Sequence, residues 1–139
     1  MMKTDVLVIG GSAAGLVSAI TAKSNHPNKK VTVVRKEEKV MIPCGIPYIF
    51  GAVGTSDKNI LPDGGLNNLG VDIVVDEIKS VDTDKKVATR AGGEEIEYDK
   101  LILCTGSLPS VPKWLKGTDL ENVFTIPKNK VYLDGLKKS

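Results

Sequence analysis

Residues 4–35 constrain the fold more than any other part of the chain, because they have the pattern of a strand, a glycine turn, a helix and a second strand. Residues 5–9 (DVLVI) form an apolar, β-prone run that is typical of a buried parallel strand. The turn 10–15 (GGSAAG) follows, and residues 13–24 have the spacing of a small-residue helix. Residues 31–34 (VTVV) form the second strand. A βαβ unit of this kind predicts an α/β fold with a parallel sheet.

The rest of the chain extends this unit. The predicted elements are a cysteine segment at 40–54 with a short helix at 45–50, a helix at 62–69, strands at 71–75, 100–104 and 123–126, an antiparallel β-meander at 77–98, and a last helix at 127–138 that starts with Pro127. We therefore expect one α/β domain over residues 1–139: a three-layer, Rossmann-like domain with a parallel sheet and a meander.

The glycine turn has the composition of a pyrophosphate-binding site. Glycines permit a tight turn and a close approach of the backbone to phosphate, and the helix that follows presents free N–H groups. The candidate residues are Gly10, Gly11, Ser12, Ala13, Ala14 and Gly15. Ser12 replaces the middle glycine of the G-x-G-x-x-G pattern, and its hydroxyl could donate to a phosphate. A glycine-rich turn in an unrelated α/β fold is the alternative.

The end of the second strand is the expected place for an acidic residue that binds the ribose hydroxyls. The chain has Arg35, Lys36 and Glu37 there. On a simple interpretation Arg35 favours a 2′-phosphate and hence NADP, whereas Glu37 could serve the ribose. A solvated run of charges is the alternative.

Cys44 is the candidate redox residue. It lies in the run Pro-Cys-Gly-Ile-Pro-Tyr (43–48), and we expect it to lead into a helix whose N-terminus stabilises a thiolate. Since no second cysteine lies nearby, Cys44 would act alone, through a mixed disulfide, a persulfide or a sulfenic acid. A buried structural cysteine is the alternative. Cys104, at the end of an apolar strand, is interpreted as a core residue.

Composition excludes several classes. With 19 basic and 17 acidic residues, a nucleic-acid or polybasic membrane surface is not expected. No apolar stretch is long enough for a transmembrane helix. One histidine and two cysteines offer no metal cluster, and they favour a reducing cytoplasm over a disulfide framework.

Three motifs together resemble one family. The turn 8–15, the run 43–48 and the stretch 98–109 (YDKLILCTGSLP) resemble the FAD-dependent pyridine nucleotide-disulfide oxidoreductases. The similarity is greatest to their single-cysteine branch, which comprises coenzyme A-disulfide reductases, NAD(P)H oxidases and persulfide reductases.

The resemblance implies a role for each matching position. The glycine-turn residues would hold the FAD pyrophosphate, Arg35 or a near neighbour such as Lys36 or Glu37 would reach the ribose, and the backbone of Ile78 would contact the adenine region. Pro43 and Cys44 would lie beside the isoalloxazine ring. Thr105 and Gly106 match the family's Ala-Thr-Gly turn, with Cys104 in place of the alanine. Electrons would pass from NAD(P)H through FAD to Cys44, and then to a disulfide, a persulfide or oxygen.

The chain departs from the family pattern in four respects. Val40 replaces a polar residue, Pro43 stands where coenzyme A-disulfide reductases can carry asparagine, and Lys23 alone stands where some members have coenzyme A-binding arginines. These changes weaken the case for a coenzyme A-type thiol or disulfide substrate. The fourth is length, which predicts that the nicotinamide and dimerisation domains act in cis or in trans and that this chain is inactive alone. Two rival interpretations are a nucleotide-binding or redox-sensing module without catalysis, and an NADP-binding Rossmann unit.

Overall fold

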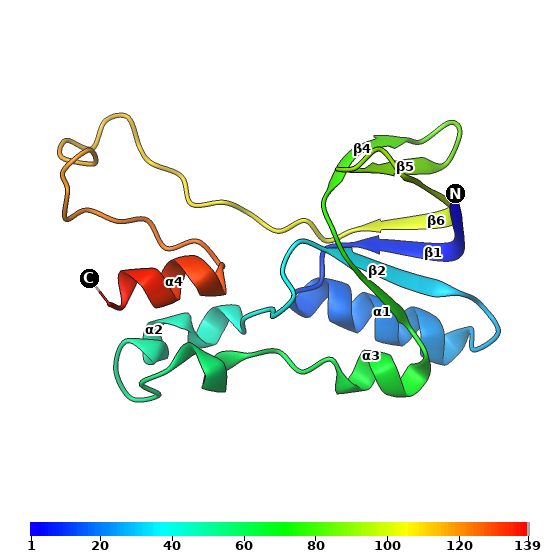
Figure 1. The fold of residues 1–139 in the computed structure, drawn as a ribbon, viewed down its shortest axis with the longest axis horizontal. Helices are drawn as coiled ribbons and strands as arrows, with labels where there is room; N and C mark the ends of the chain where they lie inside the picture. The colour runs from blue at the N-terminus through cyan, green and yellow to red at the C-terminus, as the bar shows by residue number, and fades with distance from the viewer. Residues whose placement is uncertain (139) are drawn as a thin grey trace. The chain divides into compact units, whose positions relative to one another are not determined.

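The computed structural model describes residues 1–138, which form two compact units (Figure 1). The first unit comprises Met1–Val40 and Leu61–Thr105, and the second comprises Met41–Ile60 and the chain from Gly106 onward. The elements of the first unit are β1 (Met2–Ile9), α1 (Ala13–Asn25), β2 (Val31–Arg35), α3 (Gly64–Leu69), β3 (Asp72–Val75), β4 (Ile78–Asp82), β5 (Val87–Arg90) and β6 (Glu95–Leu103). Those of the second are η1 (Pro43–Gly45), α2 (Ile46–Ile49), η2 (Ser56–Asn59) and α4 (Lys130–Leu136).

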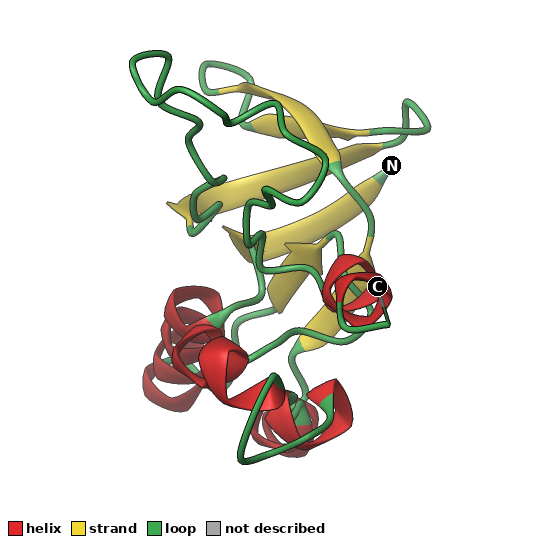
Figure 2. Cartoon of the chain, turned by 90° about the vertical axis from the view of Figure 1, so that its left-hand side faces the viewer, coloured by secondary structure: helices red, strands yellow, loops and turns green. Residues whose placement is uncertain are grey.

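All six strands of the first unit form one sheet, drawn in yellow in Figure 2. The strand order is β3-β2-β1-β6-β5-β4. The pairs β3–β2, β2–β1 and β1–β6 are parallel, whereas β6–β5 and β5–β4 are antiparallel. The predicted α/β fold with a parallel sheet and a meander is therefore confirmed.

Both faces of β2 and of the last three residues of β1 are buried, which explains their apolar sequences. Because consecutive side chains of a strand point to opposite faces, Val8 packs with Ala19 of α1 and Leu66 of α3 on one side. Its neighbour Leu7 packs on the other side with Ala88 and Ile96 of the meander. Helices, parallel sheet and meander thus form three layers. Each fully buried aliphatic side chain contributes roughly 1.5–3 kcal/mol to folding.

Three sequence expectations are corrected by the structure. The two strands predicted at 95–98 and 100–104 are one strand, β6 (Glu95–Leu103), since both halves pair with β1 in one register. The predicted strand at 123–126 is absent from the described residues. The last helix begins at Lys130, because the Asn129 side chain caps it by accepting a hydrogen bond from the Tyr132 amide.

The second unit has its own small core. Leu133 of α4 is fully buried and packs with Ile46 and Ile49 of α2 and with Met41. Polar contacts add to this packing. The Ser56 hydroxyl donates to the Asp134 carboxylate at 2.5 Å, and Lys130 pairs with both Asp134 at 2.6 Å and Asp57 at 3.0 Å. These contacts tie α4 to the residues that follow the cysteine segment.

The substitution Gly15→Ala tests the close packing of α1 on the glycine turn. A Cβ at this position would overlap the carbonyl oxygen of Gly10, which is backbone and cannot yield easily. We expect Gly15→Ala to destabilise the chain by about 1–3 kcal/mol in urea unfolding.

The matched control is Gly64→Ala at the start of α3, where a Cβ would meet nothing within 4 Å. Since alanine favours a helix over glycine by about 1 kcal/mol, this variant should be as stable as the parent or more so. Equal stability of the Gly15 and Gly64 variants would contradict the close packing.

Candidate functional site

The glycine turn lies at the carboxyl end of β1, where parallel α/β sheets bind their ligands. Gly10 has a φ of 107°, and a Cβ there would overlap the carbonyl of Cys104, so this position requires glycine. The Cys104 amide in turn donates to the Ile9 carbonyl at 2.7 Å. The end of β6 and the turn are therefore in direct backbone contact.

The N-terminus of α1 is open. Ala13 and Ala14 are exposed, and the Ser12 side chain makes no capping hydrogen bond. The first N–H groups of a helix have no partner within it, and they carry a partial positive charge. Small exposed residues leave these groups accessible, so the turn fits a phosphate group of a dinucleotide.

Arg35, at the end of β2, is buried instead of exposed. Its side chain is 4% exposed and pairs with Asp63 through two hydrogen bonds of 2.6 Å, Nη1 to Oδ1 and Nη2 to Oδ2. Nη2 also donates to the Glu38 carbonyl at 2.8 Å, and Nε is buried with no hydrogen-bond partner. Of its neighbours, Lys36 pairs with Glu77 at 3.1 Å, and Glu37 is half-buried.

The partner of Arg35, Asp63, could not be found from the sequence, because it lies 28 positions away and in no motif. It occupies the N-cap position of α3, yet its side chain makes no capping bond. The hydrogen bonds from Arg35, and secondarily the charge of Arg35, hold the pKa of Asp63 below its ordinary value of 3.8, although partial burial acts in the opposite direction.

Cys44 lies within η1, and its side chain is exposed. The structure therefore disfavours the alternative of a buried structural cysteine. Pro43 is the first residue of η1, as suits its fixed φ. Cys104 is half-buried, with its sulfur 3.9 Å from the Ser18 hydroxyl.

Asn59 holds the cysteine segment and was also not anticipated. Its Nδ2 donates to the Ile42 carbonyl at 3.0 Å, and its own carbonyl accepts from the Ile42 amide at 3.0 Å. A Cβ on Gly45 would overlap Oδ1 of Asn59. The residues on either side of Pro43 and Cys44 are thus fixed against one buried amide.

The remaining predicted site residues lie at the ends of strands. Ile78 begins β4, pairs with Arg90 of β5 and packs its half-buried side chain against the core. Thr105 and Gly106 are exposed after β6, and Gly106 has a φ of 71°. Within residues 1–138, no group of acidic, histidine and cysteine side chains could hold a metal ion, and no helix is long and apolar enough to cross a membrane.

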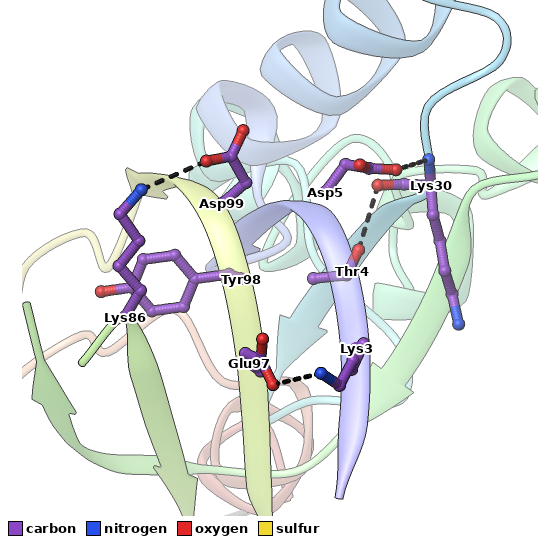
Figure 3. Close-up of a pocket in the computed structure, with 8 residues that line it drawn as sticks. All are labelled: Lys3, Thr4, Asp5, Lys30, Lys86, Glu97, Tyr98 and Asp99. Carbon is purple, nitrogen blue, oxygen red and sulfur yellow. Dashed lines mark hydrogen bonds and ion pairs between the residues drawn. The ribbon is translucent and has the colours of Figure 1, made fainter.

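A shallow pocket of about 420 Å³ lies at the opposite end of β1 from the glycine turn (Figure 3). Its charged groups are already paired: Lys3 with Glu97 at 2.8 Å and Lys86 with Asp99 at 3.2 Å, while Asp5 accepts from the Lys30 amide at 2.7 Å. A ligand would have to break these contacts, so we do not regard this pocket as the site.

The fold is that of a Rossmann-like α/β protein, and comparison with known proteins identifies its family. Residues 4–137 match the family described as pyridine nucleotide-disulphide oxidoreductase, and the chain belongs to it. This confirms the resemblance found in the sequence.

Named relatives are oxidoreductases. The chain is 36% identical over 129 residues to the NAD(P)H coenzyme A polysulfide/persulfide reductase of Pyrococcus horikoshii and 32% identical to an NADH oxidase of Methanocaldococcus jannaschii. These matches cover 89% and 86% of this chain but 29% of each relative. Among solved structures, the NAD-dependent persulfide reductase of A. fulgidus superposes with a TM-score of 0.80 and 26% identity, over 99% of this chain and 27% of that one.

The Arg35–Asp63 pair gives a pH-dependent prediction. Asp63→Asn leaves the buried guanidinium without its anionic partner, and we expect a loss of about 1–3 kcal/mol in the free energy of unfolding at pH 7. Because the pKa of Asp63 is lowered by folding, its contribution is present above 3.8 and disappears as the pH falls through the folded-state value.

Urea unfolding between pH 7 and pH 2 measures this difference. The gap between wild type and Asp63→Asn should be constant at neutral pH and shrink below the ordinary pKa of 3.8. Glu38→Gln, which removes a nearby exposed charge, should change stability by less than about 0.5 kcal/mol. A gap that stays constant down to pH 2 would show that the stabilisation by Asp63 does not depend on its ionised carboxylate.

Gly45→Ala tests the support of the cysteine segment. The added methyl would displace Asn59 or Cys44, and we expect a loss of about 1–3 kcal/mol and an altered rate of Cys44 alkylation by iodoacetamide, followed by mass spectrometry. Gly51→Ala is the control, since a Cβ there would meet nothing within 4 Å. If both variants react like wild type, Asn59 does not position the cysteine.

Proposed function

We propose that this chain is the FAD-binding portion of an NAD(P)H-dependent oxidoreductase in which Cys44 is the redox residue. The observation that carries the proposal is the exposed thiol of Cys44 in a chain of the pyridine nucleotide-disulphide oxidoreductase family. The substrate would be a small thiol, disulfide or persulfide, with a coenzyme A-type compound suggested by the name of the Pyrococcus horikoshii relative, or alternatively oxygen.

The glycine turn supports the cofactor part of the proposal. The open N-terminus of α1 and the unbonded Ser12 hydroxyl would bind the pyrophosphate of FAD. The backbone of Ile78 and the exposed Thr105 and Gly106 would line the rest of the site. When bound, FAD would carry two electrons between a nicotinamide and a sulfur atom.

Cys44 would perform the sulfur chemistry. Its thiolate would attack one sulfur of a disulfide, forming a mixed disulfide with that half of the substrate and releasing the other half as a thiolate. Two electrons, supplied ultimately by NAD(P)H, would then reduce the mixed disulfide to the Cys44 thiolate and a second thiolate. Asn59 and Gly45 would hold the cysteine in place during this cycle.

Further domains would be needed for turnover. The chain spans about 29% of the length of the relatives it matches. Several large apolar side chains in the second unit are exposed, among them Leu108 at 87%, Trp114 at 80% and Val131 at 81%. Such a surface fits contact with nicotinamide and dimerisation domains in cis or in trans, and the chain alone would be inactive.

Absorbance spectroscopy tests the cofactor. We expect the purified chain, mixed with FAD and freed of excess by gel filtration, to retain a flavin band in the visible spectrum. A folded chain that retains no flavin would count against FAD binding by these residues.

Cys44→Ser tests the redox role in the full-length protein. NAD(P)H-dependent reduction of disulfide or persulfide should fall by at least about 10³-fold, because serine is a far weaker nucleophile, while flavin content stays unchanged. Cys104→Ala should retain activity. Unchanged turnover in the Cys44 variant would exclude the proposed cycle, and retained flavin without turnover in the full-length wild type would favour a nucleotide-binding or sensing module.

A further inference from the structure

At the position that usually recognises the ribose, this chain has an arginine whose charge is neutralised by a carboxylate. Rossmann-like folds accept the ribose hydroxyls with an acidic residue at the end of the second strand, or a 2′-phosphate with an arginine there. Arg35 occupies this place, but a 4% exposed guanidinium with a carboxylate on both of its terminal nitrogens has no free charge for a phosphate.

Arg35 lies directly beside the glycine turn. Gly11 is buried against the side chain of Arg35, and an ideal Cβ on Gly11 would lie 2.5 Å from Cδ. The aliphatic part of Arg35 thus fills the space next to the turn. At the far end of the side chain, the guanidinium donates two hydrogen bonds to Asp63. A carboxylate from the start of α3 is thereby held at the terminal nitrogens of the β2 residue that packs against the turn.

Asp63 retains the capacity to bind hydroxyl groups. Its side chain is 32% exposed, whereas Arg35 is enclosed. A carboxylate has about four lone-pair positions, and Arg35 uses one on each oxygen. The remaining positions can accept hydrogen bonds from the two hydroxyls of a ribose, and Arg35 keeps the carboxylate ionised and oriented.

We propose that Asp63, oriented by Arg35, binds the adenosine ribose hydroxyls of the cofactor at the glycine turn and excludes a 2′-phosphate. This inference rests on the proposed function and names the recognition element of its cofactor site. A 2′-phosphate would lose the hydroxyl donor and place a dianion against a carboxylate, which is repulsive. Arg35 is therefore a positioning residue, and NADP is a poor ligand of this turn.

Competition against FAD on the purified chain tests the proposal with two ligands that differ only in the phosphate, ADP-ribose and 2′-phospho-ADP-ribose. Wild type should bind ADP-ribose at least about tenfold more tightly, and Asp63→Asn should reduce this ratio toward one while weakening FAD about tenfold. A purely structural role of Asp63 would weaken both competitors equally. Glu38→Gln, an exposed charge on the same loop, should leave ratio and affinity unchanged.

Each other outcome overturns the proposal. Equal binding of the two ligands by wild type, or a preference for the phosphorylated one, would do so, as would an unchanged ratio in folded Asp63→Asn. Loss of the ratio in Glu37→Gln would assign the ribose to Glu37. If Asp63→Asn does not fold, two other results test the proposal. It then requires that wild type prefers ADP-ribose and that Glu37→Gln keeps this preference. Failure of wild type to bind either FAD or ADP-ribose removes the proposed function itself, which separates that failure from failure of the ribose assignment.

Discussion

Backbone contact at the carboxyl end of β1 is the constraint on which the first unit depends. The carbonyl of Cys104 faces Gly10, and the carbonyl of Gly10 faces Gly15, with no room for a side chain at either glycine. These contacts join β6, the turn and α1 at one point. They also bring the start of α1 to the sheet edge, so the same packing that completes the core opens the helix N-terminus to a ligand.

Next to this point, the buried charge of Arg35 is neutralised by Asp63. Burying Arg35 alone would cost several kcal/mol, and Asp63 with the Glu38 carbonyl offsets that cost. The result links β2 to the start of α3 across the loop that contains the whole cysteine segment. The positive charge of Arg35, which the strand sequence suggested would bind a ligand, is thus paired within the protein.

Local patterns predicted most of the first unit. Apolar runs identified β1 and β2, the glycines identified the turn, and Gly70 identified the end of α3, where it adopts a φ of 70°. Long-range pairing was less accessible. The sequence 95–104 contains polar residues that suggest two strands, yet pairing with β1 along its whole length makes it one. α4 begins after the cap Asn129 and not at Pro127, because a side-chain cap outweighed the preference of proline for the first turn.

The candidate site shows the same division. Cys44 and the glycine turn stand in short motifs with a chemical reason for each residue, and so the sequence alone made them candidates. Asp63 and Asn59 act through partners 28 and 17 positions away, and no local pattern marks them. The role of Arg35 depends on its partner Asp63. The strand sequence alone suggested a phosphate ligand, whereas the pairing with Asp63 leads to the proposal of a ribose.

The packing of α4 bears on the order in which the chain acquires structure during synthesis. The core around Ile46 and Ile49 is closed by Leu133, and the Gly54 carbonyl accepts from Lys137. The first unit draws only on residues up to Thr105, so it can form while the remainder is still being translated. The loop that contains Cys44 must wait for residues more than 80 positions later. It would then become ordered only after the glycine turn of the first unit has already formed.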